Sequence, residues 1–186
     1  LLVGIPRILN RTQYNIDEAN LPFIGYDTWN CYEFSTLANN GFPVSGVLRI
    51  VYPSNSPNIV ESKSLKLYLN SFNMHMWGDE FWNVVDNVEE RIAGDLSVAL
   101  GTNDVHVAFL ENSSRVENPI VDIFTTIEDY INPFNLQFNH YNEDPKILQV
   151  TEKNDNEWQF YHSSVLRSNC RVTNQPDWGD VYIAIN

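Results

Sequence analysis

Residues 61–72, ESKSLKLYLNSF, carry two patterns at once. Four apolar side chains have the spacing i, i+3, i+4, i+7 that defines one face of an α-helix: Leu65, Tyr68, Leu69 and Phe72. Lys63 and Lys66 fall on another face, in what would be the first turn. Because a helix N-terminus carries partial positive charge, cations are disfavoured there. The stretch therefore predicts a helix and raises the question of what offsets its two lysines.

The segments before this helix predict a β-hairpin. Residues 28–37 (TWNCYEFSTL) are rich in aromatic side chains and roughly alternate in polarity, as a strand does. The sequence ANNGFP that follows is typical of a turn. Residues 44–53 (VSGVLRIVYP) are expected to form the second strand, antiparallel to the first.

A second helix and two more strands are expected after it. Asp79 is the expected N-cap of a helix within residues 79–100, whose apolar stripe consists of Phe81, Val84, Val85, Val88, Ile92 and Leu96. Residues 104–111 (DVHVAFLE) predict a third strand, and residues 120–131 (IVDIFTTIEDYI) are expected to contain a fourth. The order strand, strand, helix, helix, strand, strand predicts an α+β fold with both helices on one face of an antiparallel sheet.

The rest of the chain is expected to extend this unit at both ends. Residues 1–26 show little periodicity and are interpreted as an extended N-terminal arm, so that the first unit covers 27–131. Residues 132–157 are rich in Asn, Asp and Glu and predict a connector. Residues 158–186 repeat the order strand, polar loop, strand, and are interpreted as the start of a second, incomplete unit of the same kind.

Composition narrows the classes of function. The 186 residues have a net charge of −13, which repels nucleic-acid backbones, so direct binding to DNA or RNA is not expected. A membrane-spanning helix needs a run of about 18 apolar residues, and no run in this sequence approaches that length. A small anionic ligand remains compatible with this charge if the eleven basic residues are grouped locally.

The cysteines and histidines indicate a reduced protein without a metal site. Cys31 and Cys170 are far apart in the sequence and form no disulfide framework, so a cytoplasmic location is expected. The histidines are scattered and lack the spacing of zinc ligands: His75, His106, His140 and His162. Cys31 lies among aromatic residues in a predicted strand and is interpreted as a core thiol.

Cys170 is the strongest candidate nucleophile. It lies in SNCRVTNQPDWGD, with Arg167 and Arg171 on either side and Asp177 seven residues later. Neighbouring cations favour a thiolate, and an aspartate across a turn could donate or accept a proton. From these residues alone, a buried thiol in a strand is the more frequent situation for a cysteine. Both interpretations stay open on this pattern.

The polar residues at the start of the predicted helix suggest an anion site. Ser62, Lys63, Ser64 and Lys66 surround a helix N-terminus, whose backbone N–H groups bind phosphate in many proteins. The alternative is that both lysines are simply solvated. Glu61 is either a capping acid or a hydrogen-bond acceptor for a ligand. The basic pair in the arm, Arg7 and Arg11, either extends this basic zone or belongs to the general surface.

Four motifs resemble one enzyme family, over nearly the whole chain. ESKSLKLYLNSF and SNCRVTNQPDWG are similar to the signature and catalytic segments of the NADPH-dependent 7-cyano-7-deazaguanine reductases, the QueF nitrile reductase family. GIPRILNR and DTWNCYEFSTLANNGFP resemble its long, two-domain form. This resemblance implies a tunnelling fold (T-fold) and the four-electron reduction of a deazapurine nitrile to a primary amine, with two NADPH, in queuosine biosynthesis for tRNA modification.

The resemblance also implies roles for individual residues. Cys170 would be the nucleophile that forms a thioimide, and Asp177 the acid that protonates the nitrogen. Glu61 and Ser62 would lie near the substrate. The residues implied to hold the cofactor are Ser62, Lys63, Ser64 and Lys66.

One departure from the family pattern leads to further expectations. The His-Glu pair that would recognise the substrate belongs to the helical part of the second unit, which this sequence does not reach. The chain is therefore expected to be a truncated reductase with little or no activity alone. The alternative is a non-catalytic T-fold binding module. Analogy with other tunnelling-fold proteins implies a homo-oligomer, for example a dimer.

Overall fold

The computed structural model describes residues 1–111, 123–141, 144–149, 157–169 and 175–185. The chain divides into two compact units, Leu1–Val116 and Glu117–Asn186, which are described separately. Both units combine antiparallel strand pairs with short or long helices, so the α+β class is confirmed. None of the described helices is both long enough and apolar enough to cross a membrane.

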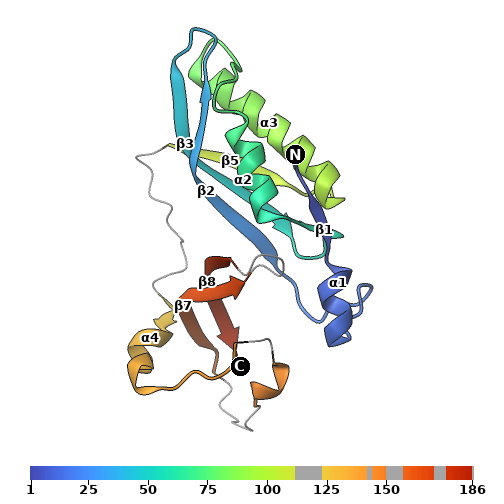
Figure 1. Ribbon diagram of the computed structural model, residues 1–186, viewed down its shortest axis with the longest axis vertical. Helices are drawn as coiled ribbons and strands as arrows, with labels where there is room; N and C mark the ends of the chain where they lie inside the picture. The colour runs from blue at the N-terminus through green and yellow to red at the C-terminus, as the bar shows by residue number, and fades with distance from the viewer. Residues whose placement is uncertain (112–122, 142–143, 150–156, 170–174, 186) are drawn as a thin grey trace. The chain divides into compact units, whose positions relative to one another are not determined.

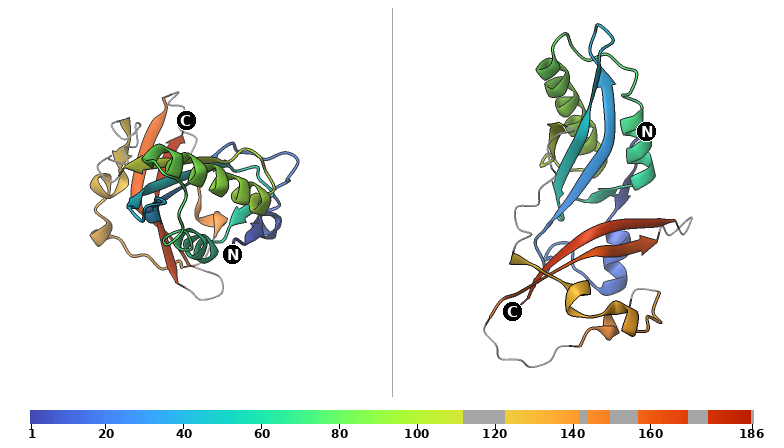
Figure 2. Two further views of the ribbon diagram at one scale, coloured as in Figure 1. Left: turned by 90° about the horizontal axis from the view of Figure 1, so that it is seen from above. Right: turned by 90° about the vertical axis from the view of Figure 1, so that its left-hand side faces the viewer.

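The first unit is built on a three-stranded antiparallel sheet with the order β2-β3-β5. Helices α2 and α3 lie on one face of this sheet (Figure 1; Figure 2 gives two further views). The bounds of these elements are β2 (Tyr26–Leu37), β3 (Pro43–Pro53), α2 (Ser62–Asn70), α3 (Phe81–Leu100) and β5 (His106–Glu111). The predicted hairpin, both helices and the third strand are thus confirmed within a few residues.

The core lies between the sheet and the two helices. Leu48, Ile50 and Tyr52 alternate along β3, which brings all three side chains to the same face, where they are fully buried. The helices contribute most of their predicted apolar faces to the same cluster: Leu65, Tyr68, Leu69 and Phe72 from α2 and its end, and Val88, Ile92 and Leu96 from α3, together with Leu100, which was not predicted. Val84 and Val85 are buried as well, but Phe81, the first residue of the predicted stripe, is 37% exposed. Helix α3 begins after Glu80, not after Asp79, whose carboxylate instead accepts a hydrogen bond from the Asn39 side chain.

A β-bulge explains why the first strand alternates only roughly. Cys31 pairs with Leu48 and Phe34 with Gly46, so two residues of β2 oppose one residue of β3 between these pairs. The bulge changes which alternate residues face the core. Before it, Trp29 and Cys31 pack against the core, and after it the buried residues are Phe34 and Thr36.

The N-terminal arm is more ordered than expected. The sequence predicts an extended arm, but the structure contains β1 (Gly4–Pro6), α1 (Ile8–Arg11) and a 3-10 turn at Thr12–Tyr14. Strand β1 pairs antiparallel with β4 (Asn58–Val60), a short strand that the sequence did not indicate. Three-residue strands are too short for an alternation pattern, which is why both were missed.

The second unit contains a hairpin with small additions. Strands β7 (Gln159–Asn169) and β8 (Pro176–Ile185) pair antiparallel, as predicted, although β8 begins at Pro176 and so includes residues expected in the loop. The strand predicted within 120–131 is present among the described residues as the short β6 (Thr125–Thr126), which is followed by α4 (Ile127–Tyr130). β6 pairs parallel to β7, so it does not extend the first sheet. The connector contains two 3-10 turns, Pro133–Asn135 and Pro145–Ile147.

The hairpins of the two units share one irregularity. In β7, Ser163 pairs with Val181 and Leu166 with Gly179, so again two residues of the first strand oppose one of the second. Among the described residues, four residue pairs follow the bulge in each hairpin, and the first of them has glycine on the second strand, Gly46 or Gly179. The two hairpins therefore share the position of the bulge and of the glycine that follows it.

Candidate functional site

Glu61 caps the helix that carries the two lysines. Its carboxylate accepts hydrogen bonds from the backbone N–H groups of Lys63, at 2.9 Å, and Ser64, at 2.6 Å. Its own carbonyl oxygen accepts the first helical bond, from Leu65 N at 3.0 Å. The negative charge of the cap lies beside the first turn, where it offsets the two cations.

This cap changes how the helix could bind a phosphate. The N–H groups of Lys63 and Ser64 would be natural phosphate donors, but they are already bonded to the Glu61 carboxylate. Both lysine side chains are exposed. Any anion held here would therefore depend on the ammonium groups of Lys63 and Lys66, not on those two backbone donors.

Ser64 differs from its neighbours because its side chain is used inside the protein. Its hydroxyl donates to the Glu61 carbonyl oxygen at 2.8 Å and accepts from the backbone N–H of Val3 at 3.1 Å. The residue is buried, with 7% of its surface exposed. These contacts give Ser64 a structural role at the helix start. Ser62, the first residue of α2, is half-buried.

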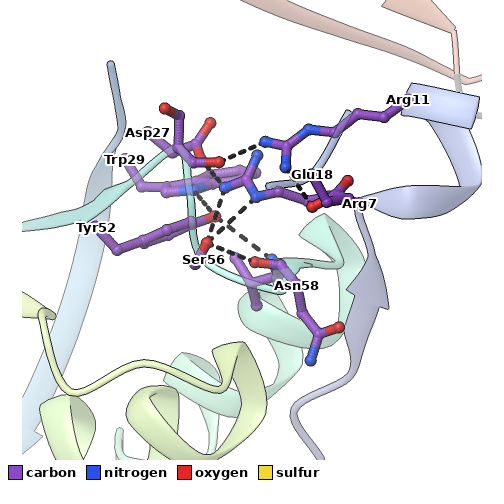
Figure 3. Close-up of polar contacts among 10 residues, drawn as sticks. Arg7, Arg11, Glu18, Asp27, Trp29, Tyr52, Ser56 and Asn58 are labelled. Carbon is purple, nitrogen blue, oxygen red and sulfur yellow. Dashed lines mark hydrogen bonds and ion pairs between the residues drawn. The ribbon is translucent and has the colours of Figure 1, made fainter. Parts of the chain in front are cut away.

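The two arginines of the arm are buried in ion pairs, so neither sequence-based interpretation of them was right. The Arg7 guanidinium pairs with Asp27 and donates to Ser56 Oγ (Figure 3). Arg11 pairs with Glu18 at 2.8 Å, and its side chain is 8% exposed. Because these charges are neutralised internally, they neither extend the basic zone nor belong to the solvated surface.

The structure places part of the predicted catalytic segment. Asp177 is half-buried in β8, opposite Ser168 in β7. Arg167 pairs with Trp178, and its guanidinium lies 5.6 Å from the centre of that ring. Since neighbouring residues of a strand point to opposite faces, Arg167 and Asp177 lie on different faces of the hairpin. Cys170 and Arg171 lie outside the described residues.

Cys31 is partly buried, which agrees in part with the core position that the sequence predicted. It packs against the buried cluster of the first unit. Burial raises the pKa of its thiol to about 11, and the positive charge of Lys66 opposes that shift. The Cys31 thiol is therefore almost entirely protonated at neutral pH, which makes it a poor nucleophile.

A hollow of about 290 Å³ lies elsewhere, beside the C-terminal half of α2. Tyr68 and Arg91 line it and both donate to the Asp95 carboxylate, each at 2.7 Å. Glu61 caps the opposite end of the helix, so the hollow is separate from the candidate residues. The described residues contain no group of three or more His, Cys, Asp or Glu side chains that could hold a metal ion.

The Glu61 cap should make the stability of the fold depend on pH. Partial burial raises the pKa of this carboxyl, but the hydrogen bonds from Lys63 and Ser64 lower it by more, so it lies below the ordinary value of 4.5. A carboxyl with a depressed pKa in the folded state stabilises the fold above its unfolded-state pKa, and this contribution is lost as the pH falls through the folded-state value.

We expect Glu61→Gln to lower the free energy of unfolding by about 1 kcal/mol at pH 7, the usual cost of a weakened helix cap. Urea unfolding of the variant and the unchanged protein measures this difference. It should shrink as the pH falls below 4.5 towards 3. A difference that stays constant over that range would contradict the charged-cap role.

Comparison with known proteins shows the family. A family model described as "Nitrile reductase, 7-cyano-7-deazaguanine-reductase N-term" matches residues 1–109, which include the arm, both helices and all of the first sheet except the last two residues of β5. The chain belongs to this nitrile reductase family. The resemblance suggested by the sequence motifs is thereby confirmed.

Three curated relatives bear the name NADPH-dependent 7-cyano-7-deazaguanine reductase. The protein from Dechloromonas aromatica (strain RCB) is 40% identical over 183 residues, that from Chromohalobacter salexigens 39% over 183, and that from Colwellia psychrerythraea 36% over 189. Each match covers 98% of this chain. The chain spans only 61–63% of the length of these relatives.

Proposed function

We propose that this chain is part of an NADPH-dependent reductase that converts the nitrile of 7-cyano-7-deazaguanine to the aminomethyl product used in queuosine biosynthesis. The observation that carries the proposal is the match to named reductases over 98% of the chain, including the segments with Cys170 and Lys63. The substrate is a neutral deazapurine, so the net charge of −13 does not oppose its binding.

Cys170 is the proposed nucleophile. Its thiolate adds to the nitrile carbon, one C–N π bond breaks, and the nitrogen takes a proton from Asp177 to give a thioimide. This adduct contains all atoms of the nitrile and of the thiol. Two successive hydride and proton additions then give the amine and release the thiol, which balances a four-electron reduction.

The first turn of α2 is the proposed cofactor region. NADPH supplies the hydrides and is a polyanion, so its phosphates require local positive charge. The exposed ammonium groups of Lys63 and Lys66 fit that requirement, and Ser62 lies beside them. Glu61 and Ser62 are also the proposed substrate-side residues. The Ser64 hydroxyl already bonds to Glu61 and Val3. Ser64 would therefore support the cofactor region indirectly, by holding the first turn of α2 in place.

The proposed fold is the tunnelling fold, in which sheets of several units close into a barrel by association. Two features support it: the helices lie on one face of the first sheet, and the bulged hairpin of that sheet recurs in the second unit. A homo-oligomer, such as a dimer, follows from this proposal by analogy.

The direct test is an assay for reductase activity with the deazapurine nitrile. It should use the protein at the full length that its gene encodes, because the present chain spans less than two thirds of its relatives. We expect two NADPH to be oxidised for each amine formed, measured by the fall in NADPH absorbance and by mass spectrometry of the product. Absence of nitrile-dependent NADPH oxidation would contradict the proposal.

A further inference from the structure

The N-terminal arm makes direct contact with the start of α2. The carbonyl oxygen of Val3 accepts a hydrogen bond from Glu61 N at 2.9 Å, and the N–H of Val3 donates to Ser64 Oγ at 3.1 Å. Strand β1 follows immediately and pairs with β4 in the register Gly4–Val60, Ile5–Ile59, Pro6–Asn58. The backbone ladder of the arm therefore ends on the residue that caps the helix.

Arg7 anchors the other end of the same ladder (Figure 3). Its backbone N–H donates to Pro57 O at 3.0 Å. Its guanidinium pairs with Asp27 in β2 and donates to Ser56 Oγ, and lies 5.8 Å from the centre of the Tyr52 ring. The Arg7 side chain is only 11% exposed, so this is an enclosed charge pair with several partners.

The Arg7 contacts continue into β4 and the core. Ser56, which is 1% exposed, donates from its hydroxyl to the Asn58 carbonyl oxygen at 2.8 Å. The Tyr52 hydroxyl accepts from Trp29 Nε1 at 3.0 Å and from Val60 N at 3.4 Å. The position of β4, directly before Glu61, is thus tied to the residues around Arg7 by side-chain hydrogen bonds.

The path of β1 allows little sliding. A Cβ atom at Gly4 would overlap the backbone oxygen of Ala99, near the end of α3. The same oxygen accepts a hydrogen bond from the Asn58 side chain at 2.9 Å. A shift of the strand by one residue would bring the side chain of Val3 or Ile5 against this oxygen, so the register of the arm is fixed sterically as well.

We propose that Arg7 is a positioning residue for the first turn of α2. By holding β1 in register, it fixes Val3 against Glu61 and Ser64, and thereby the turn from which Lys63 and Lys66 project. The consequence for NADPH rests on the proposed function, whereas the positioning of the turn does not. Loss of the Arg7 anchor should let the turn move and weaken cofactor binding, although the Arg7 charge itself is paired with Asp27.

The test compares Arg7→Met with Arg11→Met in the full-length protein. Arg11 is a matched control: it is equally buried in the arm and paired with Glu18, but its partners, which include Ser54 and Phe23, lie outside β1, β4 and α2. One readout is hydrogen exchange of the Glu61 amide, which bonds to Val3. The other is the KM for NADPH, compared with kcat.

We expect Arg7→Met to speed exchange of the Glu61 amide at least about tenfold and to raise the KM for NADPH about three- to tenfold with a smaller change in kcat, while Arg11→Met changes neither. If Arg7→Met does not fold, Arg7→Lys replaces it, because lysine keeps the charge but cannot bond Asp27 and Ser56 through a planar fork.

Equal effects of the Arg7 and Arg11 substitutions, or unchanged exchange at Glu61 in the Arg7 variant, would overturn the positioning role. Faster exchange at Glu61 without a change in the KM would overturn its link to the cofactor. If the unchanged protein does not use NADPH, the proposed function fails, and the exchange measurement still decides the positioning role.

Discussion

Replacing Cys170 with alanine is expected to lower kcat for nitrile reduction by the full-length protein at least about 10³-fold. The physical reason is that a nitrile carbon is a weak hydride acceptor until a nucleophile has added to it. Alanine offers no atom that can form the bond, whereas the volume of the side chain changes little. Steady-state oxidation of NADPH in the presence of the nitrile measures the effect.

The second cysteine provides the matched control. Cys31→Ser removes the second cysteine of the sequence, whose thiol has a pKa raised to about 11 by burial. Because that thiol is protonated and packs against the core, we expect its replacement to leave turnover within about twofold, apart from a loss of stability. Substantial residual reduction in Cys170→Ala, or equal losses in the two variants, would contradict the role of Cys170 as nucleophile.

Reversing the charge of the first helical turn is expected to impair cofactor binding strongly. In the variant with Lys63→Glu and Lys66→Glu, we expect the KM for NADPH to rise about 10- to 100-fold, because charge-assisted contacts to phosphate are replaced by repulsion. The backbone N–H groups of Lys63 and Ser64 cannot compensate while they are bonded to Glu61. The initial rate as a function of NADPH concentration measures this change.

A charge reversal elsewhere separates the local effect from the net charge. Lys146 is the exposed middle residue of a 3-10 turn in the second unit, far from α2 in the sequence, and Lys146→Glu changes the net charge by two. We expect this control to leave the KM for NADPH nearly unchanged. If the double variant at Lys63 and Lys66 behaves like the control, the two lysines are simply solvated, as the alternative interpretation of the sequence allowed.

The sequence predicted the long elements well because their patterns are periodic. The faces of α2 and α3 follow from apolar spacing alone, and apart from Phe81, which is exposed, their predicted residues are buried as expected. The bulge at Tyr32 and Glu33 could not be predicted, because it changes which alternate residues face the core and no glycine or other residue typical of a bulge marks its position. The short strands β1 and β4 are stabilised by partners distant in the sequence, which local patterns do not reveal.

In the candidate site too, contacts between neighbouring residues could be predicted, whereas contacts between residues far apart in the sequence could not. The capping role of Glu61 was one of two readings of the sequence, and the contacts with Lys63 and Ser64 establish it. The contact of Val3 with Ser64 spans 61 residues and was not predicted. Arg7 and Arg11 were also misjudged. Arginine in a polar segment suggests a surface residue, and only the fold brings Asp27 and Glu18 to these charges.

The most direct test of the central claim is the intact mass of the full-length protein after incubation with the deazapurine nitrile and without NADPH. Addition of the Cys170 thiol to a nitrile loses no atoms. We therefore expect a mass gain equal to one nitrile molecule, which persists in Cys31→Ser and disappears in Cys170→Ala. No mass gain in the unchanged protein, or a gain that survives in Cys170→Ala, would contradict the account.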